Sequence, residues 1–169
     1  PSAVTTEAGG SVSFTVALTQ EPVADVSFDV SSSNVNEGTV DVSQLTFTSG
    51  NYSVPQTVTV TGVDDSVVDG SVSYTVVLGT ASTTDSNYVG LNPDDVNLTN
   101  VDDDDPVLIL TLSGTEVAET GTLSATVTRN TTTGSPLIVN LASSDAGEAV
   151  VPETVTIAAG ATSAEFTIT

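Results

Sequence analysis

The fold is decided by an alternating stretch near the start of the chain, Ser11-Val12-Ser13-Phe14-Thr15-Val16-Ala17-Leu18. Apolar and polar residues alternate with a period of two, which is typical of a β-strand with one face buried. The same alternation recurs in Gln56-Thr57-Val58-Thr59-Val60. Clusters of Gly, Asn, Asp and Pro separate the alternating segments, and none has a helical period. The sequence therefore predicts an all-β protein, with further strands at residues 25–30, 44–48, 71–78 and 95–101.

The second half of the chain repeats the first. Glu7-Ala8-Gly9-Gly10 before the opening stretch resembles Glu119-Thr120-Gly121, and Leu45-Thr46-Phe47 resembles Val155-Thr156-Ile157. Matching residues of the two halves lie about 110 positions apart, which is the spacing of tandem immunoglobulin-like domains. We therefore predict two tandem immunoglobulin-like antiparallel β-sandwiches.

The seam between the two domains lies in an acidic run that ends at Pro106. Proline blocks continued ladder pairing, so we place the domains at residues 1–105 and 106–169. The second copy opens with a strand at residues 107–112 that has no counterpart in the first, whose first strand is therefore missing. The second copy also lacks counterparts of the last two strands of the first. An open sandwich exposes core, so either the sequence is truncated or a neighbouring chain supplies strands.

Composition excludes most enzyme classes. The chain has 22 acidic residues and one basic residue, Arg129, with no His, Cys or Lys. Catalytic triads, thiolate nucleophiles, His-ligated zinc and Schiff bases are therefore impossible. A carboxylate pair of the glycosidase type would remain, but no substrate cleft is indicated. We expect a protein that is not an enzyme.

The net charge of −21 also restricts the partners. Nucleic acid and anionic lipid bind through Lys and Arg clusters, which this chain lacks, so neither nucleic-acid binding nor direct membrane insertion is expected. The most apolar run, Val107–Leu110, is too short to span a bilayer, and no signal peptide is visible. So many carboxylates repel one another, which indicates bound cations. The general acidity of proteins adapted to high salt remains the alternative.

The acidic residues fall at one end of the predicted sandwich. In a seven-stranded antiparallel sandwich, strands A, C, E and G run toward the same end. Glu7 follows strand A, Glu37 follows strand C, Asp64 and Asp65 follow strand E, and residues 102–105 follow strand G. Calcium takes six to eight oxygen ligands and tolerates the irregular geometry of loops. The sequence therefore predicts a calcium site at this end, to which Asp69 can fold back.

These residues also carry a family resemblance. The Glu-x-Gly-Gly turn, Val63-Asp64-Asp65 and the closing run from Val101 resemble a Calx-beta domain, over most of the first copy and part of the second. The resemblance implies several calcium ions held by Glu7, Asp64, Asp65, Asp102, Asp103 and Asp104, with Asp69 and Asp105 close by. In the second copy Glu119 matches, and Asp145 is a further candidate. The loop at residues 31–40 departs from the family, because Asn34, Asn36 and Glu37 stand where an Asp is common.

Three Asn-x-Ser/Thr sequons, at Asn51, Asn97 and Asn130, predict possible N-linked glycans, and Thr131-Thr132-Thr133 could carry O-linked sugar.

Together these features predict a calcium-binding structural repeat of an extracellular or cell-surface protein of bacterial or archaeal origin, such as an adhesin spacer stiffened by calcium at the seam. Its partners would be neighbouring repeats or other copies of the chain. One alternative is a subunit of an extracellular fibril in which one copy donates strands to the next. A second alternative is a carbohydrate-binding adhesion module. Tyr52 and Tyr88, predicted to lie in loops, would be available for sugar contacts, whereas the other aromatic residues are predicted to lie in the core.

Overall fold

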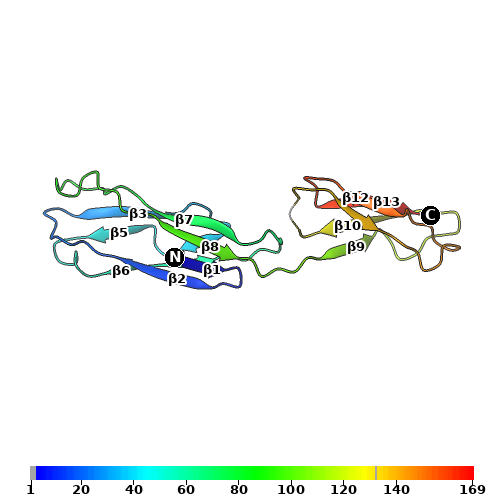
Figure 1. Cartoon of the computed structure of the whole chain (residues 1–169), viewed down its shortest axis with the longest axis horizontal. Coiled ribbons are helices and arrows are strands. Elements are labelled where there is room, and N and C mark those ends of the chain that lie inside the picture. The colour runs from blue at the N-terminus through cyan, green and yellow to red at the C-terminus, as the bar shows by residue number, and fades with distance from the viewer. Residues whose placement is uncertain (1–2, 132) are drawn as a thin grey trace. The chain divides into compact units, whose positions relative to one another are not determined.

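The structure, a computed structural model, describes residues 3–131 and 133–169. Every regular element in this part of the chain is a β-strand, which confirms the predicted all-β class (Figure 1). The strands form two compact units: unit 1 comprises the residues up to 65 and residues 70–103, and unit 2 comprises residues 66–69 and 104–169. Unit 1 holds strands β1 to β8, and unit 2 holds strands β9 to β13. The described residues contain no helix that is long and apolar enough to cross a membrane.

Unit 1 is a sandwich of two sheets (Figure 1). Its strands are β1 (Ala3–Thr6), β2 (Ser11–Val16), β3 (Val26–Ser32), β4 (Gly38–Val40), β5 (Gln44–Phe47), β6 (Gln56–Gly62), β7 (Val72–Leu78) and β8 (Val96–Val101). One sheet has the strand order β1-β8-β7-β3-β5, and the other has the order β2-β6-β4. The first and last strands of the unit therefore lie side by side at one edge.

The core of unit 1 lies between these two sheets. Val26 and Phe28 of β3 pack with Val58 and Val60 of β6, and each of these side chains is at most 4% exposed. The polar residues between them are more exposed, as a period of two predicts. The rings of Phe28 and Phe47 meet edge to face, with their centroids 6.2 Å apart, an arrangement that aromatic pairs prefer. The alternation in the sequence thus determines which face of each strand is buried.

The sequence places Glu7 after a strand but does not define the bounds of that strand, β1, because four residues are too few to show a clear period. It runs parallel to β8, with Ala3 opposite Leu98 and Thr6 opposite Val101. The other strand pairs of the described residues are antiparallel, as predicted. Parallel neighbours end at the same edge of a sheet, so the residues that follow β1 and β8 come together.

Unit 2 repeats the strand pairing of unit 1. Its strands are β9 (Leu108–Leu112), β10 (Leu123–Arg129), β11 (Leu137–Asn140), β12 (Thr154–Ile157) and β13 (Ser163–Ile168). Strand β10 pairs with β13 as β2 pairs with β6, and β11 pairs with β12 as β3 pairs with β5. Strand β9 has no counterpart in unit 1, because it pairs antiparallel with β10 while β2 pairs only with β6.

Unit 2 has no counterparts of β7 and β8 among its described residues, as the sequence predicted. Its buried core is small and centres on Val127, Val155 and Ile157. All residues of β9 are exposed, and Ile109 and Leu110 are each 56% exposed. An apolar strand at a sheet edge with this exposure is a surface suited to pairing with another strand.

Candidate metal site

The candidate site begins where β1 and β8 end. Glu7 directly follows β1, and Asp102 directly follows β8. The parallel register places Thr6 opposite Val101, and the N–H of Glu7 continues the ladder by donating to the carbonyl of Val101 at 3.0 Å. Two acidic residues that are far apart in the sequence therefore leave the same edge of the same sheet.

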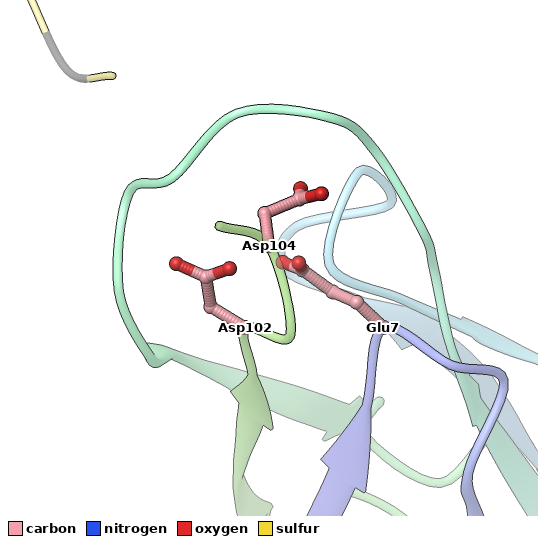
Figure 2. Close-up of side chains that lie close together, drawn as sticks. All are labelled: Glu7, Asp102 and Asp104. Carbon is pink, nitrogen blue, oxygen red and sulfur yellow. The ribbon is translucent and has the colours of Figure 1, made fainter. Parts of the chain in front are cut away.

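Asp104 joins these two residues from the segment that follows β8. One carboxylate oxygen from each of Glu7, Asp102 and Asp104 lies within 4.8 Å of the others, and the three side chains come together in Figure 2. Glu7 is only 2% exposed, while the two aspartates are half-buried. Oxygens that share one calcium ion at about 2.3–2.6 Å can lie at most about 5 Å apart. The spacing of these three carboxylates therefore fits a single shared ion.

The loop that joins β6 to β7 passes around this cluster in Figure 2. The N–H of Gly70, at the end of this loop, donates to Asp102 Oδ2 at 2.7 Å. This bond restrains the orientation of the Asp102 carboxylate. The loop is thus attached to the cluster by its backbone.

The chain offers little positive charge of its own to balance its carboxylates. The chain has a single arginine and no lysine. Arg129 lies in unit 2, where it is 5% exposed and donates to the carbonyls of Ser135 at 2.9 Å and Ala161 at 3.0 Å. A chain so poor in basic residues attracts cations from solution wherever its carboxylates converge.

The other predicted ligands lie outside this group of three. Six of them are exposed: Asp64, Asp65, Asp69, Asp103, Asp105 and Glu119. Among the described residues there is no second group of three metal-ligating side chains. Asp145, the further candidate in unit 2, is exposed as well. The structure thus gathers a subset of the predicted residues and leaves the rest on the surface of the loops.

The residues of the loop before β4 that the sequence offers as ligands lie outside the group of three carboxylates. Asn34 Oδ1 accepts the N–H of Asn36 at 3.2 Å, so its side chain is part of the local turn. Glu37 is 6% exposed and accepts a hydrogen bond from Asn100 at 3.4 Å. Asn100 was missed altogether, because an Asn within a strand reads as an exposed polar residue. Its only signal was its place two residues before Asp102.

The three sequons lie in different surroundings. Asn51 Oδ1 accepts the N–H of Thr48 at 2.6 Å, and exposed Asn97 Oδ1 accepts from Thr75 at 3.1 Å. Asn130 bonds at both ends, since Oδ1 accepts the N–H of Val107 at 2.8 Å and Nδ2 donates to the carbonyl of Asp105 at 3.0 Å. A glycan on Asn130 would take one of the two hydrogens of this Nδ2, next to the backbone of Asp105. Thr132 lies outside the described residues.

The two tyrosines predicted to remain available for sugar contacts are packed into unit 1. Tyr88 is 9% exposed, and its hydroxyl donates to the carbonyl of Gln20 at 2.6 Å. Tyr52 is half-buried against the hydrophobic core. The interpretation of Tyr88 as an accessible loop residue was wrong, because its loop folds back over the core and buries the ring. Neither ring is presented as a platform for a sugar.

Comparisons with known proteins identify no family. No family model and no curated protein matches the chain. Among solved structures, it is similar to the crystal structure of CBD12 from CALX1.2, with a TM-score of 0.46 and 14% identity, covering 98% of this chain and 71% of that one. It is also similar to the calcium binding domain CBD12 of CALX1.1, with a TM-score of 0.43, 14% identity and the same coverage. Similarities of this size transfer no property to this chain.

Proposed function

We propose that this chain is a calcium-binding, non-catalytic β-sandwich segment of an extracellular or cell-surface protein. The observation that carries the proposal is the convergence of Glu7, Asp102 and Asp104, with one oxygen from each within 4.8 Å of the others. An all-oxygen donor set suits a hard cation, and the absence of His and Cys from the sequence disfavours zinc. Calcium accepts irregular geometry from loops, whereas magnesium demands an octahedron and retains its waters.

The position of the site in the chain suggests what the ion would do. Asp102 and Asp104 belong to the segment that connects β8 to β9. An ion held by both residues and by Glu7 would restrict the backbone of this segment and stiffen the connection. Calcium would also stabilise the folded chain by about 2.7 kcal/mol when its free concentration is a hundredfold above the dissociation constant. This behaviour suits a spacer repeat that stiffens after reaching the calcium-rich exterior of a cell.

Calorimetric titration of the chain with calcium tests this proposal. The variant Glu7→Gln/Asp102→Asn/Asp104→Asn keeps the shape of the cluster and removes its charge, so we expect its affinity to fall by about 100-fold or more. The matched control Glu116→Gln/Glu148→Gln/Glu153→Gln removes the same charge from exposed positions in unit 2 and should leave the affinity unchanged. Unchanged binding by the cluster variant would refute the proposed site. Equal losses in both variants would instead indicate general acidity.

A second candidate function, assembly by strand complementation, is favoured by the open side of unit 2. In unit 1 the core includes Tyr74, Val76 and Leu78 of β7 and Leu98 of β8, all buried. Unit 2 has no such strands among its described residues, and β9 exposes its apolar side chains. Strands from a second copy of the chain would cover this side and produce a fibril.

Light scattering and electron microscopy of the full chain test this second function. Ile109→Lys places a charge on the exposed edge strand and should abolish assembly. Val23→Lys changes a residue of unit 1 that is 84% exposed and serves as the control. A chain that stays monomeric at high concentration, or fibrils unaffected by Ile109→Lys, would exclude assembly through β9.

A further inference from the structure

A buried amide lies beneath the candidate site. Asn100, on β8, is 0% exposed. A buried amide is costly unless its donors and acceptor are satisfied, so its hydrogen bonds define what it does. Strand β8 carries this residue two positions before Asp102, on the side of the strand that faces into unit 1.

The side chain of Asn100 connects three other segments of unit 1. Its Oδ1 accepts from Thr5 Oγ1 on β1 at 3.0 Å. Its Nδ2 donates to the carbonyl of Val63, just after β6, at 3.0 Å, and to Glu37 Oε2, just before β4, at 3.4 Å. The network continues from Thr5 Oγ1 to the hydroxyl of Tyr74 on β7, 2.9 Å away. One amide therefore holds together four segments that are far apart in sequence.

The segments joined by this amide continue into acidic residues. Thr5 lies two residues before Glu7, and Val63 directly precedes Asp64. The amide itself lies two residues before Asp102. Converging carboxylates repel one another, and this repulsion would push the ends of these strands apart. Hydrogen bonds in a buried, low-dielectric setting resist that separation more strongly than bonds in water.

Gly62 provides the space for this arrangement. A Cβ at this position would lie 2.5 Å from Asn100 Oδ1 and even closer to the carbonyl oxygen of Thr6. Any side chain at residue 62 would therefore displace the amide or strand β1. The close approach of β6 to the amide therefore requires the glycine at residue 62.

We propose that Asn100 is a positioning residue for the candidate calcium site, on which this inference rests. It does not bind the ion. Its amide holds the ends of β1, β6 and β8 and the loop before β4 in the arrangement that brings Glu7 to Asp102 before any ion arrives. Loss of residues that orient metal ligands typically costs about 10- to 100-fold in affinity.

Calorimetric titration of the full chain with calcium, comparing Asn100→Ala with Tyr74→Phe, tests the proposal. Asn100→Ala should weaken calcium binding by about 10- to 100-fold although every acidic residue is retained. Tyr74→Phe removes a hydroxyl from the same buried network without touching the amide, so its dissociation constant should stay within about threefold of the original. A purely structural role would lower the stability of both variants and leave the affinity of the folded chain unchanged.

A second measurement is made without calcium. In the presence of a chelator, Asn100→Ala should accelerate hydrogen exchange at the amide of Glu7, which bonds to Val101, and at the amide of Val63, which bonds to Glu37. Thr5→Val removes the two bonds that the Thr5 hydroxyl makes, to Asn100 and to Tyr74, with little change in shape. It should also weaken calcium binding, and it replaces Asn100→Ala as the test if that variant does not fold.

The outcomes separate this inference from the proposed function. In one outcome the original chain binds calcium, while Asn100→Ala and Thr5→Val keep dissociation constants within about twofold of its own. That result would overturn the positioning role and leave the calcium site intact. An original chain that binds no calcium would overturn the site itself, and with it the role of Asn100.

Discussion

The two units contain the same turn and place its acidic residue differently. In unit 1, Glu7 is 2% exposed and meets the residues that follow β8. In unit 2, the corresponding Glu119 is exposed, and no described residue of that unit forms a metal-ligating group with it. The local sequence is similar, so the difference comes from the last strand. The described residues of unit 2 include no strand that pairs as β8 does and could bring further acidic residues to Glu119.

Features that depend only on local sequence do recur in both units. Asn34 Oδ1 accepts the N–H of Asn36 at 3.2 Å in unit 1, and Asp145 Oδ1 accepts the N–H of Gly147 at 2.9 Å in unit 2. Each is a turn that closes within three residues and needs no distant strand. The contrast teaches that repeated sequence preserves turns, while the convergence of Glu7, Asp102 and Asp104 depends on the pairing of strands remote in sequence.

The largest expected effect comes from weakening β8. Leu98 is 1% exposed and lies opposite Ala3 and Tyr74 in the two neighbouring strands. Leu98→Ala leaves a cavity and should lower the free energy of unfolding of unit 1 by about 2–5 kcal/mol. Urea denaturation followed by tyrosine fluorescence measures this change, because the three tyrosines of the chain all lie in unit 1 and there is no Trp.

Val155→Ala is the matched control in unit 2, where Val155 is 8% exposed. It should leave the tyrosine-reported transition unchanged, because its cavity forms in the other unit. A loss below about 1 kcal/mol for Leu98→Ala would show that β8 contributes little to unit 1. The structural explanation of the difference between the units would then fail.

A smaller effect concerns low pH. The backbone N–H groups of Asn87 and Val23 donate to the Asp85 carboxylate at 2.8 and 2.7 Å, and these bonds hold the pKa of Asp85 below its usual range. A lowered folded-state pKa gives stability that is present above the unfolded value of about 3.9. That stability is lost as the pH falls through the folded pKa. The tyrosine-reported stability of unit 1 should therefore decline below about pH 4.

Asp85→Asn should flatten that part of the decline and lower the stability of unit 1 at neutral pH, since the ionised acceptor is gone. Asp145→Asn in unit 2 is the control, because Asn34 already makes the equivalent turn with an amide. If the stability of the original chain and of Asp85→Asn falls in parallel with decreasing pH, Asp85 does not cause this part of the decline.

The smallest effect comes from one backbone position. Thr120 has a φ of 67°, whereas Gly9 in the matching turn of unit 1 has a φ of 79°. A β-branched residue is strained in this region and glycine is not, so Thr120→Gly should stabilise unit 2 by about 0.5–1 kcal/mol. Differential scanning calorimetry of the full chain measures the shift. The reverse change, Gly9→Thr, should destabilise unit 1, and no loss on that change would refute the strain at Thr120.

Much of the fold could be predicted from the sequence, but the short first strand could not. The seven predicted strands all form within a few residues of their expected ends, because most alternate with a period of two and residues 107–112 form a short apolar run bounded by turn residues. Strand β1 forms because it pairs in parallel with β8, and the paired residues Ala3 and Leu98 lie more than ninety positions apart in the sequence. No local pattern in the sequence reveals such a partner. The candidate site shows the same limit. The topology predicted an acidic end, yet only backbone geometry decides which carboxylates converge.

The sequence by itself determined the strand class, the internal repeat, the chemistry that is excluded and the end of the sandwich where acidic residues collect. Each of these follows from residue type, spacing or composition, which act locally or by simple counting. The tertiary structure decided that Glu7, Asp102 and Asp104 meet and that Asn100 is buried beneath them. The physical reason is that burial and ligand convergence depend on contacts between strands remote in sequence, above all on the pairing of β1 with β8.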